Sequence, residues 1–459
     1  MKKYSIAFSL FLLTVSSLAQ VADPITEQKE SGERSLSLSQ LLDSARLNNI
    51  EMRNARRSIE TAQFQRKEAF TKYFPNISGT GMWFNANRGM AKTNINPSEV
   101  IPESLTPMLA QMFPPEALAA LANPVSITMM KNGTIAGINA VQPVFAGGQI
   151  INGNKLAKIG EEAACLQLEL SENEVEKTVE QYFWQIVSLQ EKIKTIQAVE
   201  AMLNSLHKDV DVAVRAGVAM RNDLLQVELR QNEIESQKLK LNNGISIVRM
   251  LLAQYCGLSE TDFTLSYSTE TTSPVPLKQD HQQALLVTPE YQLLGKQVEA
   301  AALQTKMTLG QYLPTVAVGA GYNYHNLMEN NRTFAMIFAT VSVPISDWWG
   351  GSHAIKRKKM EYMKAVDEQQ DKSELLKIRM QNAWNSVNES YQLLQIAHRS
   401  IEQAEENLRL NRDYYKAGTI KMSDLLEAQL LYQQSFDKCT DAWVDYQNRL
   451  LEYKQSVGQ

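Results

Sequence analysis

One turn sequence occurs twice in this chain, and the organisation of the rest follows from it. Residues 215–225 read RAGVAMRNDLL, and residues 416–426 read KAGTIKMSDLL. In both copies a glycine follows a basic residue and an alanine, and an aspartate stands six residues beyond the glycine. Glycine gives the backbone the freedom to reverse, and the aspartate can cap the returning helix. The two stretches therefore predict two helical hairpins, one in each half of the chain.

Two further pairs of matching blocks precede these turns in the same order. YFP at residues 73–75 corresponds to YLP at residues 312–314, and QPVFAGG at residues 142–148 corresponds to VPISDWWGG at residues 343–351. Ordered recurrence of proline and glycine is hard to obtain by chance and indicates an internal duplication. Each repeat is predicted to run helix, strand, strand, long helix, turn and helix.

The duplication sets the predicted domains. The first repeat covers residues 20–256 and the second covers residues 281–459. Residues 257–280 lie between them, are rich in Ser and Thr, and contain two prolines, which is typical of a linker.

The first repeat carries an insertion between its two strands. Pro75 and Pro143 are 68 residues apart, whereas Pro314 and Pro344 are 30 residues apart. The extra segment, about residues 89–132, contains six prolines. This composition predicts a long loop with at most one short helix, near residues 116–121.

Composition excludes two classes of protein. The 459 residues include 46 Lys and Arg against 50 Asp and Glu, and this near balance argues against a basic nucleic-acid binder. Beyond the first twenty or so residues, no apolar run approaches the roughly 18 residues of a membrane-spanning helix, which excludes a helical membrane protein.

The sequence contains no motif of enzymatic or cofactor chemistry. Its three cysteines are an odd and widely spaced set, and its five histidines lack the spacing of metal ligands. Glycine-rich phosphate-binding motifs and the G-x-S-x-G of hydrolases are also missing. We therefore expect no catalytic, cofactor-binding or metal site, and a protein that is not an enzyme.

Residues 1–19 have the order of a secretory signal peptide. Two lysines precede an apolar stretch at residues 6–15, and Ser17 and Ala19 are the small residues that a signal peptidase reads. This order predicts export and a mature chain that begins near Gln20. The alternative is an ordinary buried N-terminal helix.

The segment that follows Gly148 predicts a very long helix. It has no proline as far as Val214, and a helix of about 65 residues would be about 100 Å long. Its apolar positions recur about every 3.5 residues, the spacing of supercoiled helices; they are Val175, Val179, Phe183, Ile186, Leu189, Ile193, Ile196, Val199, Leu203, Leu206 and Val210. A stripe facing an ordinary bundle explains any two turns equally well, but not so long a helix. A second long helix is predicted at residues 352–415.

Four segments alternate in the manner of β-strands, near residues 76–87, 134–145, 316–325 and 333–343. The third has apolar residues that end in two tyrosines on one face, and small or polar residues on the other. Its length and alternation match a transmembrane β-strand with lipid on one side and water on the other. Half-buried strands of a soluble protein would look similar, so the pattern leaves both interpretations open.

Aromatic residues at the strand ends nearest the helices favour the membrane, because an interfacial girdle is expected at such a level. They are Tyr73, Phe74, Tyr312, Trp348 and Trp349. The alternative is that they pack against helix caps.

Four strands leave two open edges, which hydrocarbon cannot satisfy, so a barrel needs further copies of the chain. A barrel of eight strands is filled by its own side chains, and larger barrels open toward a channel. The residues thus predict an oligomeric outer-membrane barrel that continues as a helical tube into the periplasm.

With its duplication, its YFP and YLP strand starts and its two glycine turns, the chain resembles the TolC family of outer-membrane efflux and secretion channels. The resemblance covers nearly all of the mature chain. It implies a mainly α fold with a small β part: a homotrimer whose four strands per chain form a twelve-stranded barrel, above a coiled-coil helical tunnel. The linker would wrap this tunnel as an equatorial region.

The resemblance also implies a function and partners. Family members are passive exit ducts that carry small molecules or polypeptides from the periplasm to the outside. They work in tripartite efflux pumps or type I secretion systems, with a periplasmic adaptor protein and an inner-membrane pump. No cofactor and no nucleic acid is implied.

The two turns match the family's periplasmic tips, which dock the adaptor. The residues concerned are Ala216, Gly217, Val218, Ala417, Gly418 and Thr419. A plain hairpin with a capped helix is compatible with the same residues.

A periplasmic gate is implied at the second turn. Asp424 and Glu427 share one helix face and match an acidic pair that lines the closed tunnel entrance. Tyr415 matches a gate tyrosine, and Asp223 its partner on the neighbouring helix. The sequence departs from the family at Ile420, where an arginine is expected; either Lys421 substitutes for it or the lock is weaker.

The alternative function is a soluble periplasmic coiled-coil scaffold with a small β-subdomain and no channel activity. Recovery of the protein in the membrane or in the soluble periplasm separates these two hypotheses.

Overall fold

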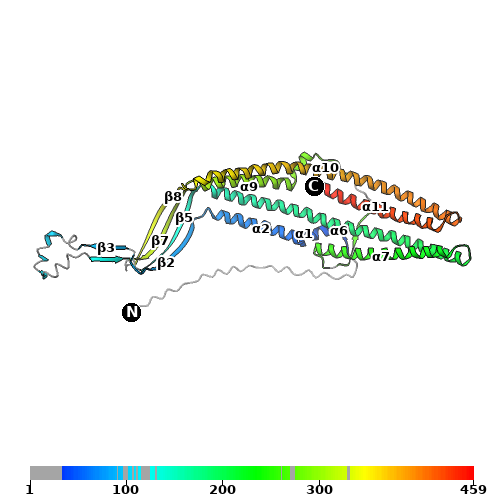
Figure 1. Ribbon diagram of the computed structural model, residues 1–459, viewed down its shortest axis with the longest axis horizontal. Coiled ribbons are helices and arrows are strands. Elements are labelled where there is room, and N and C mark those ends of the chain that lie inside the picture. Colours follow the sequence, from blue (N-terminus) through cyan, green and yellow to red (C-terminus); the bar gives the residue numbers. More distant parts are fainter. Residues whose placement is uncertain are drawn as a thin grey trace, which may run out of the picture.

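The structure, a computed structural model, is an elongated molecule with a β-sheet toward one end and long paired helices that run to the other (Figure 1). It describes residues 34–89, 91–96, 102–105, 108–109, 112–114, 125–129, 132–259, 261–268, 274–327 and 331–459. The predicted signal peptide at residues 1–19 and the predicted short helix at residues 116–121 lie outside these ranges. The mainly α fold with a small β part is confirmed.

The helices of the first half begin after a short strand, β1 (Arg34–Ser37), and are α1 (Leu38–Asn48), α2 (Ile50–Thr71), α6 (Gln149–Arg215) and α7 (Arg221–Cys256). Those of the second half are α8 (His281–Val287), α9 (Pro289–Gln311), α10 (Trp348–Lys416) and α11 (Met422–Ser456). The two predicted long helices are therefore α6 and α10, with 67 and 69 residues.

The main sheet has four antiparallel strands in the order β2 (Asn76–Asn85), β5 (Asn132–Ala146), β7 (Thr315–Asn326) and β8 (Asn331–Ser342). The central β5 and β7 come from different halves of the chain, so the sheet is continuous across the duplication. Pairing runs from Thr134 opposite Asn326 to Ala146 opposite Thr315, with an irregularity between Pro143 and Phe145. Proline has no N–H for the ladder, which is the reason for a bulge at this point.

Helix packing repeats the order of the strands. Beside the sheet, α2 packs on α6, α6 on α9, and α9 on α10. Further away, α7 folds back along α6, and α11 folds back along α10 (Figure 1). The molecule therefore consists of a sheet, a four-helix layer below it, and two helical hairpins.

The predicted heptad stripe of α6 is the seam of the helical part. Eight of its eleven positions are buried, among them Val179, Ile186 and Val199, each with no exposed surface. They belong to two apolar clusters. One lies at mid-length, where Phe183, Leu252 and Tyr446 meet, and the other joins the two hairpins near their turns.

Two parts of the chain contain strands that the sequence did not predict. In the insertion, expected to be a loop, β3 (Ala91–Ile95) pairs antiparallel with β4 (Val125–Met129), because β-branched residues recur in both segments. In the linker, β6 (Phe263–Ser266) pairs in parallel with β1, which ties the start of the described chain to the junction of the repeats. A short 3₁₀ turn, Glu103–Leu105, lies in the insertion.

The junction between sheet and helices depends on two glycines that touch. Gly147, in the turn after β5, has a φ of +59°, and a side chain added there would collide with the backbone of Gly310 near the end of α9. A side chain added at Gly310 would collide with the carbonyl oxygen of Gly147 in turn. This contact holds the two halves of the chain together where helices become strands.

Replacing Gly310 with alanine should therefore destabilise the protein by about 1–3 kcal/mol, because the backbones must separate to admit the methyl group. The matched control is Gly160→Ala in the interior of α6, where the added methyl meets no atom within 4 Å. That change should be neutral or stabilising, since alanine is the better helix former. Thermal unfolding of the purified protein measures both, and equal melting temperatures would contradict the packing role of Gly310.

A partly buried carboxyl group in α6 makes stability depend on pH. Burial raises the pKa of Glu180 from 4.5 to about 6, against a hydrogen bond of 3.3 Å from Trp184 Nε1 that favours the charged form. The folded state thus binds this proton more tightly than the unfolded state does. Its contribution is present below pH 4.5 and is lost as pH rises through about 6.

Glu180→Gln should abolish this dependence. Relative to wild type, it should gain about 2 kcal/mol when the pH moves from below the unfolded pKa to above the folded one. Chemical denaturation at both pH values measures the difference. The exposed Glu169→Gln serves as control and should show no such gain; a parallel response of both variants would contradict the assignment.

Candidate functional site

Both predicted turns form the same helix ending. Gly217 and Gly418 have φ values of +77° and +74°, in the left-handed region that favours glycine. The N–H of the next residue reaches back five positions in each hairpin: Val218 donates to the carbonyl of Ala213 at 2.9 Å, and Thr419 to that of Tyr414 at 3.0 Å. This is the Schellman arrangement, which satisfies carbonyl groups at the end of a helix.

The two aspartates that stand six residues after the turn glycines cap the returning helices. The Asp223 carboxylate accepts a hydrogen bond of 3.1 Å from the backbone N–H of Met220, and the Asp424 carboxylate accepts one of 3.2 Å from Lys421. A carboxylate at a helix N-terminus is also stabilised by the helix dipole. Each aspartate therefore has a structural role, whatever else it does.

The six predicted docking residues are exposed at the far ends of the hairpins. Val218 keeps 80% of its surface exposed, and the nearby Met220 keeps 74%. Nothing lies within 4 Å of a side chain added at Gly217 or Gly418, so these glycines are required by backbone conformation and not by lack of space.

The predicted gate residues separate into two places. Tyr415, Asp223 and Ile420 line one groove of about 590 Å³ between the two hairpins. Burial and the nearby Asp223 carboxylate raise the pKa of Tyr415, which agrees with the proximity of the two residues. Asp424 and Glu427 lie elsewhere, on the exposed face of α11, while Met422, Leu425 and Ala428 of the same turns are buried.

Sequence reasoning missed the basic side chains of this groove. Arg412 and Lys416, on the last turns of α10, line the groove with Asp223 and Tyr415, whereas Lys421 does not. Arg412 precedes Ile420 by eight residues, and no spacing rule brings two residues across a helix end together; only the folded hairpin does.

A buried polar network joins the two hairpins further from the turns. Arg230 of α7 is 8% exposed and donates to the Gln433 side chain of α11 at 2.8 Å, and Gln433 donates to Gln237 at 2.9 Å. Gln429, one helical turn before Gln433, is 2% exposed, and neither polar atom of its amide has a partner among the described residues. The sequence signal for this network is a polar residue at a position where the helical pattern of α7 or α11 predicts an apolar one.

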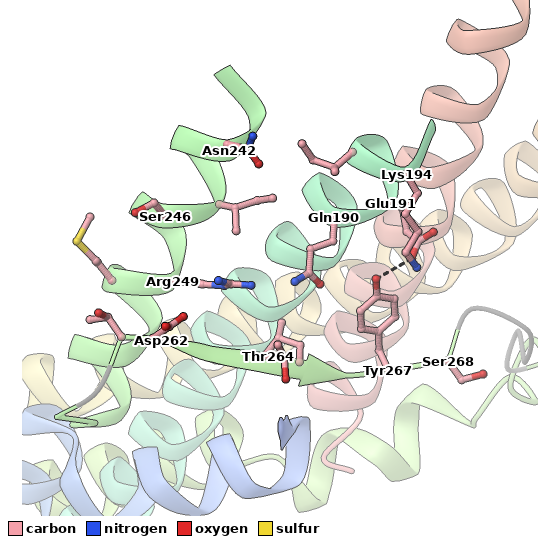
Figure 2. Close-up of a pocket in the computed structure, with 15 residues that line it drawn as sticks. Gln190, Glu191, Lys194, Asn242, Ser246, Arg249, Asp262, Thr264, Tyr267 and Ser268 are labelled. Carbon is pink, nitrogen blue, oxygen red and sulfur yellow. Dashed lines mark hydrogen bonds and ion pairs between the residues drawn. The ribbon is translucent and has the colours of Figure 1, made fainter. Parts of the chain in front are cut away.

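A polar pocket of about 920 Å³ lies at mid-length, between α6, α7 and the linker strand β6 (Figure 2). Tyr267 of the linker donates to Glu191 of α6 at 2.7 Å, and Lys194 donates to the same carboxylate at 2.7 Å. Burial and the Glu191 carboxylate raise the pKa of Tyr267. Arg249 of α7 and Gln190 of α6 point toward one another across the pocket. These contacts attach the linker to the first helical hairpin.

The five predicted girdle residues lie at the junction of sheet and helices. Trp349 is 82% exposed and Phe74 56%. Tyr312 also has a packing role, since its ring lies against Gly351 and its carbonyl accepts a bond of 2.8 Å from Trp348 Nε1. Phe70 lies beside two of them, with its ring centroid 5.6 Å from those of both Tyr73 and Phe74.

Within the ranges that the structure describes, no three His, Cys, Asp or Glu side chains are grouped so that they could hold a metal ion. A separate search of the same ranges finds no helix that combines the length and the apolar character needed to cross a bilayer.

Comparison with known proteins agrees with the resemblance drawn from the sequence. The family model described as "Outer membrane efflux protein" matches residues 281–459. The outer membrane protein TolC of Vibrio cholerae serotype O1 is 19% identical over 343 residues, which are 70% of this chain and 76% of that protein.

Solved structures of outer-membrane channels share the fold over most of the chain. The structure of CusC has a TM-score of 0.76 at 13% identity and covers 94% of this chain and 95% of its own. The outer-membrane channel OprN gives 0.74 at 14% identity, with coverages of 92% and 89%. The CmeC outer membrane channel of Campylobacter jejuni gives 0.73 at 13% identity, with coverages of 95% and 90%. The predicted resemblance to TolC-like channels is confirmed, and at these identities the structural likeness is one of fold.

Proposed function

We propose that this protein is the exit duct of a tripartite efflux pump or secretion system, set in the outer membrane and extending into the periplasm. It would carry small molecules or polypeptides outward without a chemical step of its own. Its partners would be two further copies of the chain, outer-membrane lipid, a periplasmic adaptor and an inner-membrane pump that supplies the energy.

The observation that carries this proposal is the division of the main sheet into two faces. Cross-strand partners point to the same side, so the register assigns every side chain. One face is apolar and strongly exposed, with Ile77 at 69%, Ile138 at 63%, Tyr322 at 60% and Ile337 at 91%. The other face is mixed: it carries the polar residues Ser78, Thr80, Asn139, Asn323, His325 and Arg332 together with apolar residues such as Met82, Ile135 and Phe334. An apolar exposed face of this kind is suited to lipid.

The edges of the sheet support an assembly of three chains. In the described residues β2 pairs with β5 alone, and β8 with β7 alone, so one edge of each remains open. An unpaired backbone group in hydrocarbon costs several kcal/mol, and only a closed barrel removes such edges. Three copies supply twelve strands, enough to leave a lumen.

The proposed arrangement gives each part of the chain a location. The insertion, about residues 89–132, would be extracellular, and the linker, residues 257–280, would form an equatorial belt between the repeats at residues 20–256 and 281–459. The hairpin turns would face the adaptor with their exposed residues Val218 and Met220.

The first test asks where the protein resides and whether it conducts. The full chain should fractionate with the outer membrane and need detergent for release, because of the apolar sheet face. Purified in detergent and added to planar bilayers, it should form trimeric channels. Recovery in the soluble periplasm without detergent would contradict the duct and favour a scaffold.

We further propose that the hairpin turns form a gate. Asp424 and Glu427 of three chains would make two rings of carboxylates at the tunnel entrance, which attract cations. Asp223, Tyr415 and Arg412 would hold the two hairpins of one chain together through the groove between them.

Neutral isosteres test the rings without removing the helix cap. Asp424→Asn keeps an oxygen for the N–H of Lys421, so the double variant with Glu427→Gln should fold like wild type and lose most of the cation preference of the conductance. Reversal potentials in a salt gradient measure this preference. Exposed Asp413→Asn, one turn before the reversal, is the control; unchanged selectivity in the double variant would contradict the acidic gate.

A further inference from the structure

The inner face of the sheet, which is the face that carries Ser78, Asn139 and Asn323, is more apolar on β8 than on its partner β7. The register aligns Arg332 with His325, Phe334 with Asn323, Met336 with Gly321, and Phe338 with Gly319. The four residues on β8 therefore form one line, which we call the β8 lane. It starts at the end of the sheet remote from the helices and, at about 3.4 Å per residue, is about 20 Å long.

The lane lies on the crowded side of the sheet, among polar neighbours. The ring of Phe334 meets the ring of His325 edge-on, with centroids 5.9 Å apart. Phe338 lies over Gly319, where an added side chain would collide with its ring, and this glycine is buried. Asn323 and Asn139 lie over Gly137 and Gly321 in the same manner. The ring of Phe338 thus occupies the space above a glycine, while Phe334 and Met336 keep 44% and 42% of their surface exposed.

Charge on the four strands has a single sign. These strands contain no Asp or Glu. Their ionisable side chains are Arg332, His325 and the two tyrosines of β7. Arg332 is exposed and has no ion pair within the described part of the chain. The nearest acidic residue along the chain, Glu329, lies outside that part.

We propose that the β8 lane binds an amphipathic organic anion, such as an aryl sulfonate or carboxylate, on its way out. The guanidinium of Arg332 would hold the anionic group, and Phe334, Met336 and Phe338 would contact the apolar body. A cation would be repelled at Arg332, and a small polar anion would leave the apolar part of the lane unused. The inference rests on the proposed function, since it takes this face as the wall of the lumen.

The experiment measures how far ligands added from the side of the insertion block the current through channels in planar bilayers. 2-Naphthalenesulfonate has both the anionic group and the apolar body, methanesulfonate has only the former, and 2-naphthol has only the latter. Wild-type channels should be blocked by 2-naphthalenesulfonate at concentrations at least about tenfold below those needed for the other two, because a charge-assisted contact and apolar burial add.

Variants assign the block to residues. Arg332→Gln should weaken block by 2-naphthalenesulfonate about tenfold and leave block by 2-naphthol unchanged. A variant with Phe334, Met336 and Phe338 each changed to serine should reduce 2-naphthalenesulfonate to the level of methanesulfonate. Thr340→Ala, at the next inward position of β8 beyond the lane, is the matched control and should behave like wild type.

The outcomes separate this inference from the function on which it rests. Channels that are blocked equally in wild type and Arg332→Gln would overturn the lane alone, and so would equal block by methanesulfonate and 2-naphthalenesulfonate. Absence of any channel would overturn the exit duct and the lane together. Arg332 is exposed near the end of the sheet, so its variant decides the question even if the triple serine variant does not assemble.

Discussion

The pairing of β5 with β7 is the interaction on which the rest of the structure depends. It joins the two halves of a duplicated chain into one sheet, and the helices that continue from the strands then pack in the same order. Hydrogen bonds of a β-ladder allow no sliding, because a shift of one residue would turn every side chain to the other face. The contact of Gly147 with Gly310 and the position of the girdle aromatics follow from that register.

In the proposed assembly, the same constraint would make the monomer incomplete. A ladder that satisfies β5 and β7 on both sides leaves β2 and β8 with one open edge each. Water can satisfy such edges, but hydrocarbon cannot. In the proposed duct, the apolar face of the sheet would lie in lipid, and insertion into the membrane would then require closure by further copies. The long helices would also be covered by further copies in the proposed assembly. Apolar side chains such as Leu229 and Ile378 are 64% and 63% exposed in the single chain.

The two ends of the proposed duct differ in charge. At the hairpin turns, carboxylates of Asp424 and Glu427 stand on an exposed helix face, whereas the inner face of the sheet carries Arg332 and no acid within its strands. Local hydrogen bonds fix the position of some of these side chains and not of others. Asp424 is bound to the helix N-terminus by its cap, so its position is fixed by local folding, while Arg332 and Glu427 have no such tie among the described contacts.

Local patterns in the sequence were enough for the duplication, the two long helices, the four main strands and the hairpin turns, because proline, glycine and the 3.5-residue and two-residue periods act over a few residues. They also placed the Asp223 and Asp424 caps. They did not predict the strands of the insertion, nor that of the linker, where β1 and β6 are stabilised by partners more than 200 residues away in the chain. Only the tertiary structure brought Arg412 to the groove of Asp223 and Tyr415, joined Arg230 to Gln433, and aligned the β8 lane. Each of these depends on how separate elements pack, which no local spacing encodes.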